Sequence, residues 1–289
     1  MARIKPYIIL LRPHQYLKNL FIFAPIFFGG KICQIEPLLD TMLAFVSFSL
    51  VASSIYILND YHDIDEDRAH PIKKFRPLAS GQVQLAAAFM LMAGLILAGG
   101  VLALLQNTVL FSIICGYVFL NILYSLGLKH VSLVDVFIIA LGFVLRIYAG
   151  AAVTGIPLSM WIVLMTFLLA LFLALAKRRD DILLSLQQKN VRKNIDGYTI
   201  ELANSAMTIM ASVIMVSYIM YTVSADVISK FHTEYLYTTS IFVLFGILRY
   251  LQITFVEKKS GSPTMILLKD RLLQYALAAW ILFFTIMIY

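Results

Sequence analysis

About nine apolar segments, each of about 20 residues and separated by short polar loops, follow one another along this chain of 289 residues. A helix needs about 20 mainly apolar residues to cross the hydrocarbon core of a membrane. The expected spans are residues 15–34, 38–58, 83–104, 107–125, 133–152, 158–176, 203–223, 235–255 and 271–289. The pattern predicts an all-α, polytopic membrane bundle of about nine transmembrane helices, with residues 1–289 as a single integral-membrane domain.

Composition agrees with a membrane protein. Charged residues make up 13% of the chain and the mean hydropathy is +0.87, whereas about a quarter of the residues in soluble domains are charged. The short loops leave no room for a separate soluble domain. Residues 7–11 form too short an apolar run for a cleavable signal peptide, and they run directly into Arg12. We expect membrane lipids, and no nucleic acid, as partners.

The distribution of basic residues predicts the orientation. Most of the 23 lysines and arginines precede the first span or lie in the loops after spans two, four, six and eight. Only Lys31 and Lys230 lie in loops on the opposite side. Short loops rich in lysine and arginine stay in the cytoplasm. We therefore expect a multi-pass protein of a bacterial-type inner (cell) membrane, with the N-terminus inside and the C-terminus outside; the oligomeric state stays open.

An acidic cluster follows the second span, in the stretch YILNDYHDIDEDRAHPIKKFRPLASG of residues 56–81. If the helix continues past the membrane surface, Asp60, Asp63 and Asp67 lie within about 60° of one another, and Asp65 points to the far side. Crowded carboxylates repel unless a cation joins them, and Mg²⁺ is commonly held by one or two carboxylates plus phosphate oxygens. The spacing predicts a magnesium site on the three aspartates, flanked by Asn59. The alternative is a solvated acidic helix end, loosely paired with the lysines that follow.

Four cations come directly after the aspartates: Arg68, Lys73, Lys74 and Arg76. Guanidinium groups match phosphate oxygens two at a time. An acidic motif beside a basic one indicates a metal ion and a phosphate bound together, on the cytoplasmic side.

The pattern Asn59-Asp60-x-x-Asp63-x-x-x-Asp67, followed by RPLASG at residues 76–81, resembles the UbiA superfamily of intramembrane prenyltransferases. The nine-helix bundle of that superfamily agrees with the expected spans. Four further pieces are similar to one family within it, the decaprenyl-phosphate phosphoribosyltransferases. These pieces are residues 12–19, 124–130, 142–150 and 267–271.

The loop after span six departs from the aromatic prenyltransferases of the superfamily, which carry a second motif of the form D-x-x-x-D there. Residues 176–181 read AKRRDD, with only Asp180 and Asp181 behind three cations. Such a basic site suits an anionic phosphate better than a second metal ion. A UbiA-type aromatic polyprenyltransferase, acting on 4-hydroxybenzoate or in a quinone pathway, stays open as the alternative. A transporter is disfavoured because the spans carry few ionisable groups.

The resemblance implies Mg²⁺-dependent transfer of the 5-phosphoribosyl group from phosphoribosyl pyrophosphate to a polyprenyl phosphate, with release of diphosphate. It also implies a role in supplying arabinan precursors for cell-wall biogenesis. Asp60, Asp63 and Asp67 would be the catalytic metal ligands. The acceptor phosphate is already anionic, so no general base is needed. The length of the polyprenyl chain and the fate of the product do not follow from the sequence.

Further residues are predicted to bind the substrates, although each cation taken alone could equally be a positive-inside anchor. Lys129 is the only cation in its loop, and Arg146 lies deep inside span five, where an ionisable group faces either a cavity or a bracing partner. The predicted substrate-binding residues are Lys18, Asn59, Lys73, Arg76, Tyr124, Lys129, Asp135, Arg146, Lys177, Arg178, Arg179, Asp180 and Asp181.

Overall fold

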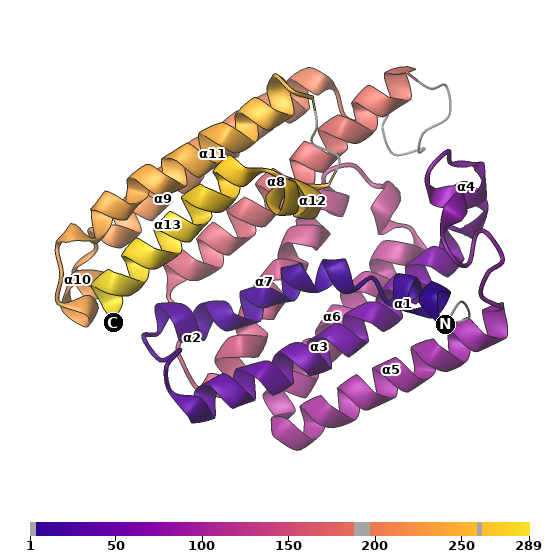
Figure 1. Cartoon of the computed structure of the whole chain (residues 1–289), viewed down its shortest axis with the longest axis horizontal. Coiled ribbons are helices and arrows are strands. Elements are labelled where there is room, and N and C mark those ends of the chain that lie inside the picture. The colour runs from indigo at the N-terminus through magenta and orange to yellow at the C-terminus, as the bar shows by residue number, and fades with distance from the viewer. Residues whose placement is uncertain (1–3, 188–196, 259–261) are drawn as a thin grey trace. The chain divides into compact units, whose positions relative to one another are not determined.

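The computed structural model describes residues 4–187, 197–258 and 262–289 (Figure 1). Every regular element in these ranges is a helix. The chain divides into two compact units, residues 1–158 and 159–289, and each is described here by itself. The expectation of a single domain stays a prediction.

The first unit carries the acidic motif and the elements around it. Its elements are α1 (Lys5–Leu11), η1 (Pro13–Phe23), α2 (Ala24–Phe28), α3 (Ile35–His62), α4 (Ile64–Ala69), η2 (Lys73–Phe75), α5 (Leu85–Gln106), α6 (Thr108–Leu126), η3 (Leu128–His130) and α7 (Val134–Thr154), where η marks a 3₁₀ helix. The second unit consists of α8 (Met160–Gln187), α9 (Ile200–Thr222), α10 (Ala225–Phe231), η4 (Tyr235–Thr239), α11 (Ser240–Phe255), α12 (Pro263–Lys269) and α13 (Arg271–Ile288).

Eight helical segments of the described residues are long and apolar enough to cross a membrane, and they coincide with eight of the expected spans. The chain is therefore an all-α, multi-pass membrane protein, as predicted. One of these segments joins η4 to α11 and covers Tyr235–Phe255.

The remaining expected span, residues 15–34, has a different structure. It consists of the 11-residue 3₁₀ helix η1 and the five-residue helix α2. This segment is not among the eight helices of the described residues that are long and apolar enough to cross a membrane, so the ninth span stays a prediction. The hydropathy did not predict the 3₁₀ helix.

The long helix α3 forms the core of the first unit and packs along α5 (Figure 1). Gly99 makes this close approach feasible, because a Cβ atom there would lie 2.7 Å from the Ser47 carbonyl oxygen and 2.7 Å from a methyl group of Val51. The Ser47 hydroxyl donates to the Gly99 carbonyl oxygen at 2.6 Å. Small residues allow such backbone approach between membrane helices.

Candidate active site

The three aspartates of the acidic motif lie on nearly continuous helix. α3 ends at His62 and α4 begins at Ile64. The backbone bonds continue through the break, because the Asp63 N–H donates to the Asn59 carbonyl at 2.9 Å and the Asp67 N–H to the Asp63 carbonyl at 2.7 Å. The side chains of Asp60 and Asp67 are each only 2% exposed. That of Asp65 is 89% exposed, on the far side as expected.

Two arginines hold the buried pair of carboxylates. Arg76 Nη1 lies 3.0 Å from Asp60 Oδ1 and 2.7 Å from Asp67 Oδ2, so one nitrogen bridges both side chains. Arg12 Nη2 also bonds Asp60 Oδ1, which therefore accepts from two guanidinium groups. Burying a carboxylate is costly unless it is paired and hydrogen-bonded, and these contacts satisfy that condition.

Asp63 turns to a different partner, Lys129, which is 9% exposed. Lys129 lies in η3, directly after the end of α6. Close by, the Ser125 hydroxyl at the end of α6 contacts both Asn59 Oδ1 and the Asn121 carbonyl oxygen. Lys129 thus pairs with a carboxylate of the motif, and its predicted contact with a substrate phosphate stays a prediction.

The carboxylates fit a metal ion that shares its coordination with a phosphate. Asp60 and Asp67 converge on a single cationic nitrogen of Arg76, which marks a place where a positive charge is bound between them. Mg²⁺ is usually held by one or two carboxylates plus phosphate oxygens. Asp63 points to Lys129, and the described residues contain no group of three or more His, Cys, Asp or Glu side chains arranged around one metal position. The site thus differs from the three-aspartate ligand set expected from the helical spacing.

Arg12 is a site residue to which the sequence analysis assigned no individual role. Its backbone has φ 53° and ψ 56°, in the left-handed region, directly before Pro13. The guanidinium lies 5.3 Å from the ring centre of Tyr56 in addition to its pair with Asp60. Burial lowers the pKa of Arg12, and the Asp60 carboxylate offsets part of that effect. The signal in the sequence was the Arg12-Pro13 pair directly before the first expected span.

Four other predicted residues lie in the elements of this unit. Lys18 lies in η1, Lys73 in η2, Tyr124 near the end of α6, and Asp135, fully buried, in the first turn of α7. Their roles in substrate binding stay predictions.

Arg146 is enclosed by its own unit and only 4% exposed. It donates to Asn19 Oδ1 at 2.8 Å, to the Gly142 carbonyl at 2.7 Å and to the Tyr117 hydroxyl at 3.4 Å. The rings of Phe48, Tyr117 and Phe143 surround the guanidinium at 5.0 to 5.2 Å. These contacts favour the bracing role that the sequence left open.

The basic stretch after span six belongs to the second unit and continues α8. Arg178 Nη1 pairs with Asp181 Oδ2 at 2.6 Å. Arg179 donates to Asn204 Oδ1 and to the Thr254 carbonyl, both at 2.7 Å, and lies over the ring of Phe255. Lys177 is exposed and Asp180 is half-buried.

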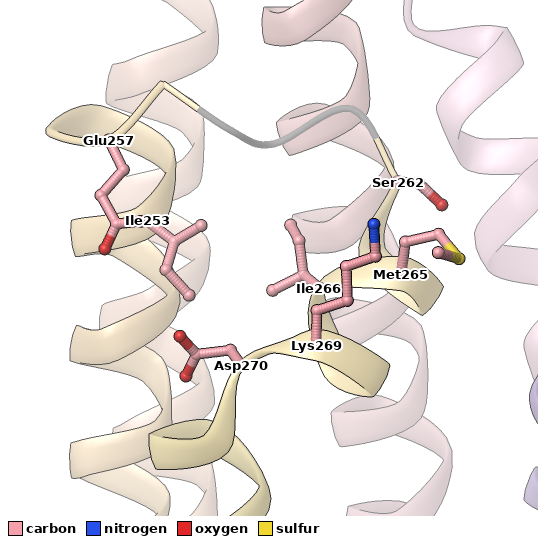
Figure 2. Close-up of a pocket in the computed structure, with 7 residues that line it drawn as sticks. All are labelled: Ile253, Glu257, Ser262, Met265, Ile266, Lys269 and Asp270. Atoms are coloured by element: carbon pink, nitrogen blue, oxygen red, sulfur yellow. The ribbon is translucent and has the colours of Figure 1, made fainter.

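A cavity of about 400 Å³ also lies in the second unit, where α11, α12 and the start of α13 meet. Figure 2 shows Glu257 and Asp270 on one wall and Ser262 and Lys269 on the other. Asp270 caps α13 by accepting from the Leu273 N–H at 2.8 Å, and Arg249 Nη2 pairs with it at 2.6 Å. The hydrogen bond from Arg249 lowers the pKa of Asp270.

Comparison with known proteins shows the family of the chain. The model of the UbiA prenyltransferase family matches residues 22–268. A decaprenyl-phosphate phosphoribosyltransferase of Mycolicibacterium smegmatis is 33% identical over 282 residues, 94% of this chain and 88% of that protein. Its counterpart of Corynebacterium glutamicum is 31% identical over 284 residues, 96% of this chain and 85% of that protein.

The fold is also similar to a solved structure. A UbiA homolog from Archaeoglobus fulgidus, bound to GPP and Mg²⁺, has a TM-score of 0.71 and 21% sequence identity, covering 98% of this chain and 99% of that one. The chain belongs to the UbiA prenyltransferase family.

Proposed function

We propose that this protein transfers the 5-phosphoribosyl group from phosphoribosyl pyrophosphate to a polyprenyl phosphate and releases diphosphate. The observation that carries the proposal is the interleaving of acidic and basic side chains at one end of the first unit, where Arg12, Arg76 and Lys129 meet Asp60, Asp63 and Asp67. Such a set suits a diphosphate bound with a divalent cation. The two phosphoribosyltransferase relatives, similar over almost the whole chain, support this donor.

In the proposed reaction Asp60 and Asp67 would hold Mg²⁺, and Asp63, which pairs with Lys129, is the third carboxylate beside them. When bound there, Mg²⁺ would supply positive charge that stabilises the departing diphosphate. Arg12, Arg76 and Lys129 bind and orient the phosphate oxygens. When the bond between the anomeric carbon and the diphosphate breaks, these basic side chains hold the departing diphosphate. An oxygen of the acceptor phosphate, already anionic, forms the new bond at that carbon. No residue has to remove a proton.

The proposed orientation places this site at the cytoplasmic face of the membrane, with the N-terminus inside and the C-terminus outside. The excess of lysine and arginine in the loops after even-numbered spans supports it. Phosphoribosyl pyrophosphate, a soluble and highly charged donor, would then reach the site from the cytoplasm, and the polyprenyl phosphate from the bilayer.

A second candidate is prenyl transfer to an aromatic acceptor. The fold likeness to a homolog solved with GPP and Mg²⁺ favours it, although that likeness concerns the fold alone. The three consecutive cations Lys177, Arg178 and Arg179, in place of a second aspartate motif, weigh against it.

The test is transfer of radiolabel from ribose-labelled phosphoribosyl pyrophosphate into an organic-extractable lipid, with purified protein, Mg²⁺ and polyprenyl phosphates of several lengths. We expect labelled lipid from the wild type and from Asp65→Asn, and little from Asp63→Asn. Absence of labelled lipid together with prenylation of 4-hydroxybenzoate from a polyprenyl diphosphate would exclude the proposal and support the second candidate.

A further inference from the structure

Each of the three aspartates of the motif holds a basic side chain from the same unit. Asp60 holds Arg12 and Arg76, Asp67 holds Arg76, and Asp63 holds Lys129. The three cations come from the α1–η1 junction, the loop before α5 and η3, so segments distant in the sequence converge on the carboxylates. The acidic motif is neutralised by the protein itself.

A divalent metal and these cations compete for the same oxygen atoms. Nη1 of Arg76 lies between Asp60 and Asp67, at the place where a metal would contact both. Mg²⁺ binds oxygen at about 2.0–2.1 Å and gives up its water reluctantly. It would also be repelled by any guanidinium that stays nearby. A metal ion that binds without a diphosphate must therefore displace these cations from the carboxylates, and no phosphate is present to accept them.

A diphosphate changes this balance, because it offers the displaced cations new partners. Guanidinium groups bind phosphate oxygens in bidentate fashion, at least as well as they bind carboxylates. The diphosphate also adds negative charge that offsets the incoming metal. The same exchange of partners thus favours metal and diphosphate binding together over either one alone.

Arg12 is placed for this exchange by an unusual backbone. A non-glycine residue in the left-handed region, directly before a proline, is disfavoured twice, and such conformations persist where the surrounding structure imposes them. Here Ser53 donates to the Leu11 carbonyl at 3.0 Å and bonds the Tyr16 hydroxyl at 2.8 Å, which fixes the chain on both sides of Arg12. The backbone is fixed, while the side chain, 21% exposed, retains access to solvent.

We propose that Arg12, together with Arg76, makes binding of the divalent metal conditional on the diphosphate of the donor. The two guanidinium groups hold the carboxylates until the diphosphate is present, and then transfer to its phosphate oxygens while the carboxylates bind the metal. This inference rests on the proposed function and adds to it that the metal binds only together with the donor. Arg12 is accordingly a donor-positioning residue.

The test measures metal binding without turnover. Radioactive Mn²⁺, a substitute for Mg²⁺, is equilibrated with purified protein at fixed free Mn²⁺, with and without inorganic pyrophosphate, and the retained metal is counted. We expect the wild type to bind Mn²⁺ at least about tenfold more tightly with pyrophosphate than without it. Arg12→Gln should bind Mn²⁺ alone about tenfold more tightly than the wild type, and should gain less from pyrophosphate.

The matched control is Lys5→Gln, which removes an exposed cation of α1, the helix directly before Arg12, and which lies outside the site. It should behave as the wild type does. Arg12→Lys, which keeps the charge, should restore most of the dependence on pyrophosphate. The wild-type comparison needs no variant, so it tests the inference even if Arg12→Gln does not fold.

Equal Mn²⁺ affinity of the wild type with and without pyrophosphate would overturn the inference and leave the proposed function intact. An unchanged Mn²⁺ affinity of folded Arg12→Gln would exclude Arg12 from the role. Retention of no Mn²⁺ under any condition would overturn both the inference and the metal dependence of the proposed reaction.

Discussion

Arg146 donates a hydrogen bond from Nε to Oδ1 of Asn19, 2.8 Å away, and thereby joins α7 to the 3₁₀ helix η1. Asn19 in turn donates to the Ser49 hydroxyl of α3 at 2.8 Å. A 3₁₀ helix of 11 residues is unusually long, and its internal hydrogen bonds are weaker than those of an α-helix. The side chain of Arg146 therefore supports the segment that leads to Arg12 at the carboxylates.

Arg146→Met should lower the stability of the protein. The change leaves the buried Asn19 Oδ1 and Tyr117 hydroxyl without this donor, and an unsatisfied buried group costs about 1–3 kcal/mol. Thermal unfolding in detergent measures the effect, with Leu141→Met, at an exposed position of the same helix, as the control. Unchanged stability of Arg146→Met with a raised KM for the donor would favour the cavity role instead.

Asp67 and Asp65 provide a direct comparison within the motif. Asp67→Asn should reduce ribosyl transfer by a factor on the order of 10² or more, because the site loses a charge that holds Arg76 and that, in the proposed reaction, would hold Mg²⁺. Asp65→Asn changes only an exposed pair with Arg68 and should retain nearly full activity. Initial rates of label transfer at saturating Mg²⁺ measure both. Equal losses in the two variants would mean that the total negative charge of the segment matters, rather than the helix face that Asp60, Asp63 and Asp67 share.

The contrast between these two aspartates was predictable, because helical spacing alone decides which carboxylates share a face. The eight long spans were predictable for a similar reason, since about 20 apolar residues leave few alternatives in a membrane. Lys129 was singled out as the only cation of its loop, but the sequence did not indicate its pair with Asp63.

The partners within the site were beyond reach of the sequence. Arg12 contacts Asp60 across 48 residues, and its left-handed backbone depends on Ser53 and Tyr16. Asp63 pairs with Lys129 rather than with an arginine, because η3 places the Lys129 ammonium group beside it. Such pairings are tertiary contacts, and one sequence carries no periodic signal for them.

Gly99 should tolerate substitution poorly. In Gly99→Ala the new methyl group would meet the Ser47 carbonyl and Val51 at 2.7 Å, and overpacking of this kind typically costs about 1–3 kcal/mol. Gly94 lies on the same helix with nothing within 4 Å of the corresponding position, so Gly94→Ala should change stability little. Unfolding temperatures of the two variants give the comparison. Equal stability would contradict the close packing of α3 on α5.

Arg179→Gln should affect stability more than donor affinity. Its guanidinium joins α8 to Asn204 of α9 and to the Thr254 carbonyl of α11, and hydrogen bonds from a charged donor contribute about 1.5–3 kcal/mol each. The exposed Lys177, two residues earlier, is the control for stability, since Lys177→Gln removes the same charge at the surface. A donor KM that rises in Arg179→Gln at unchanged unfolding temperature would support the predicted substrate contact instead.

The pair of Arg249 and Asp270 should make stability depend on acid pH. The hydrogen bond from Arg249 lowers the pKa of Asp270 below its unfolded value of about 3.9. The contribution of the pair is therefore fully present above the unfolded pKa and is lost as the pH falls through the folded pKa.

Asp270→Asn separates this charge effect from helix capping, because asparagine still accepts from the Leu273 N–H. We expect its unfolding temperature to lie below that of the wild type by a constant amount from about pH 5 to 8, and the difference to close below about pH 4. The loss of stability in Asp270→Asn should be modest, since Arg249 keeps its contacts with Glu257 at 2.9 Å and with Gln252 at 2.7 Å. Asp270→Ala should lower the free energy of unfolding by about 1 kcal/mol more than Asp270→Asn does, because alanine cannot cap α13. A gap between the wild type and Asp270→Asn that is as large at pH 3 as at pH 7 would show that the asparagine disturbs packing, and that the charge is not the cause.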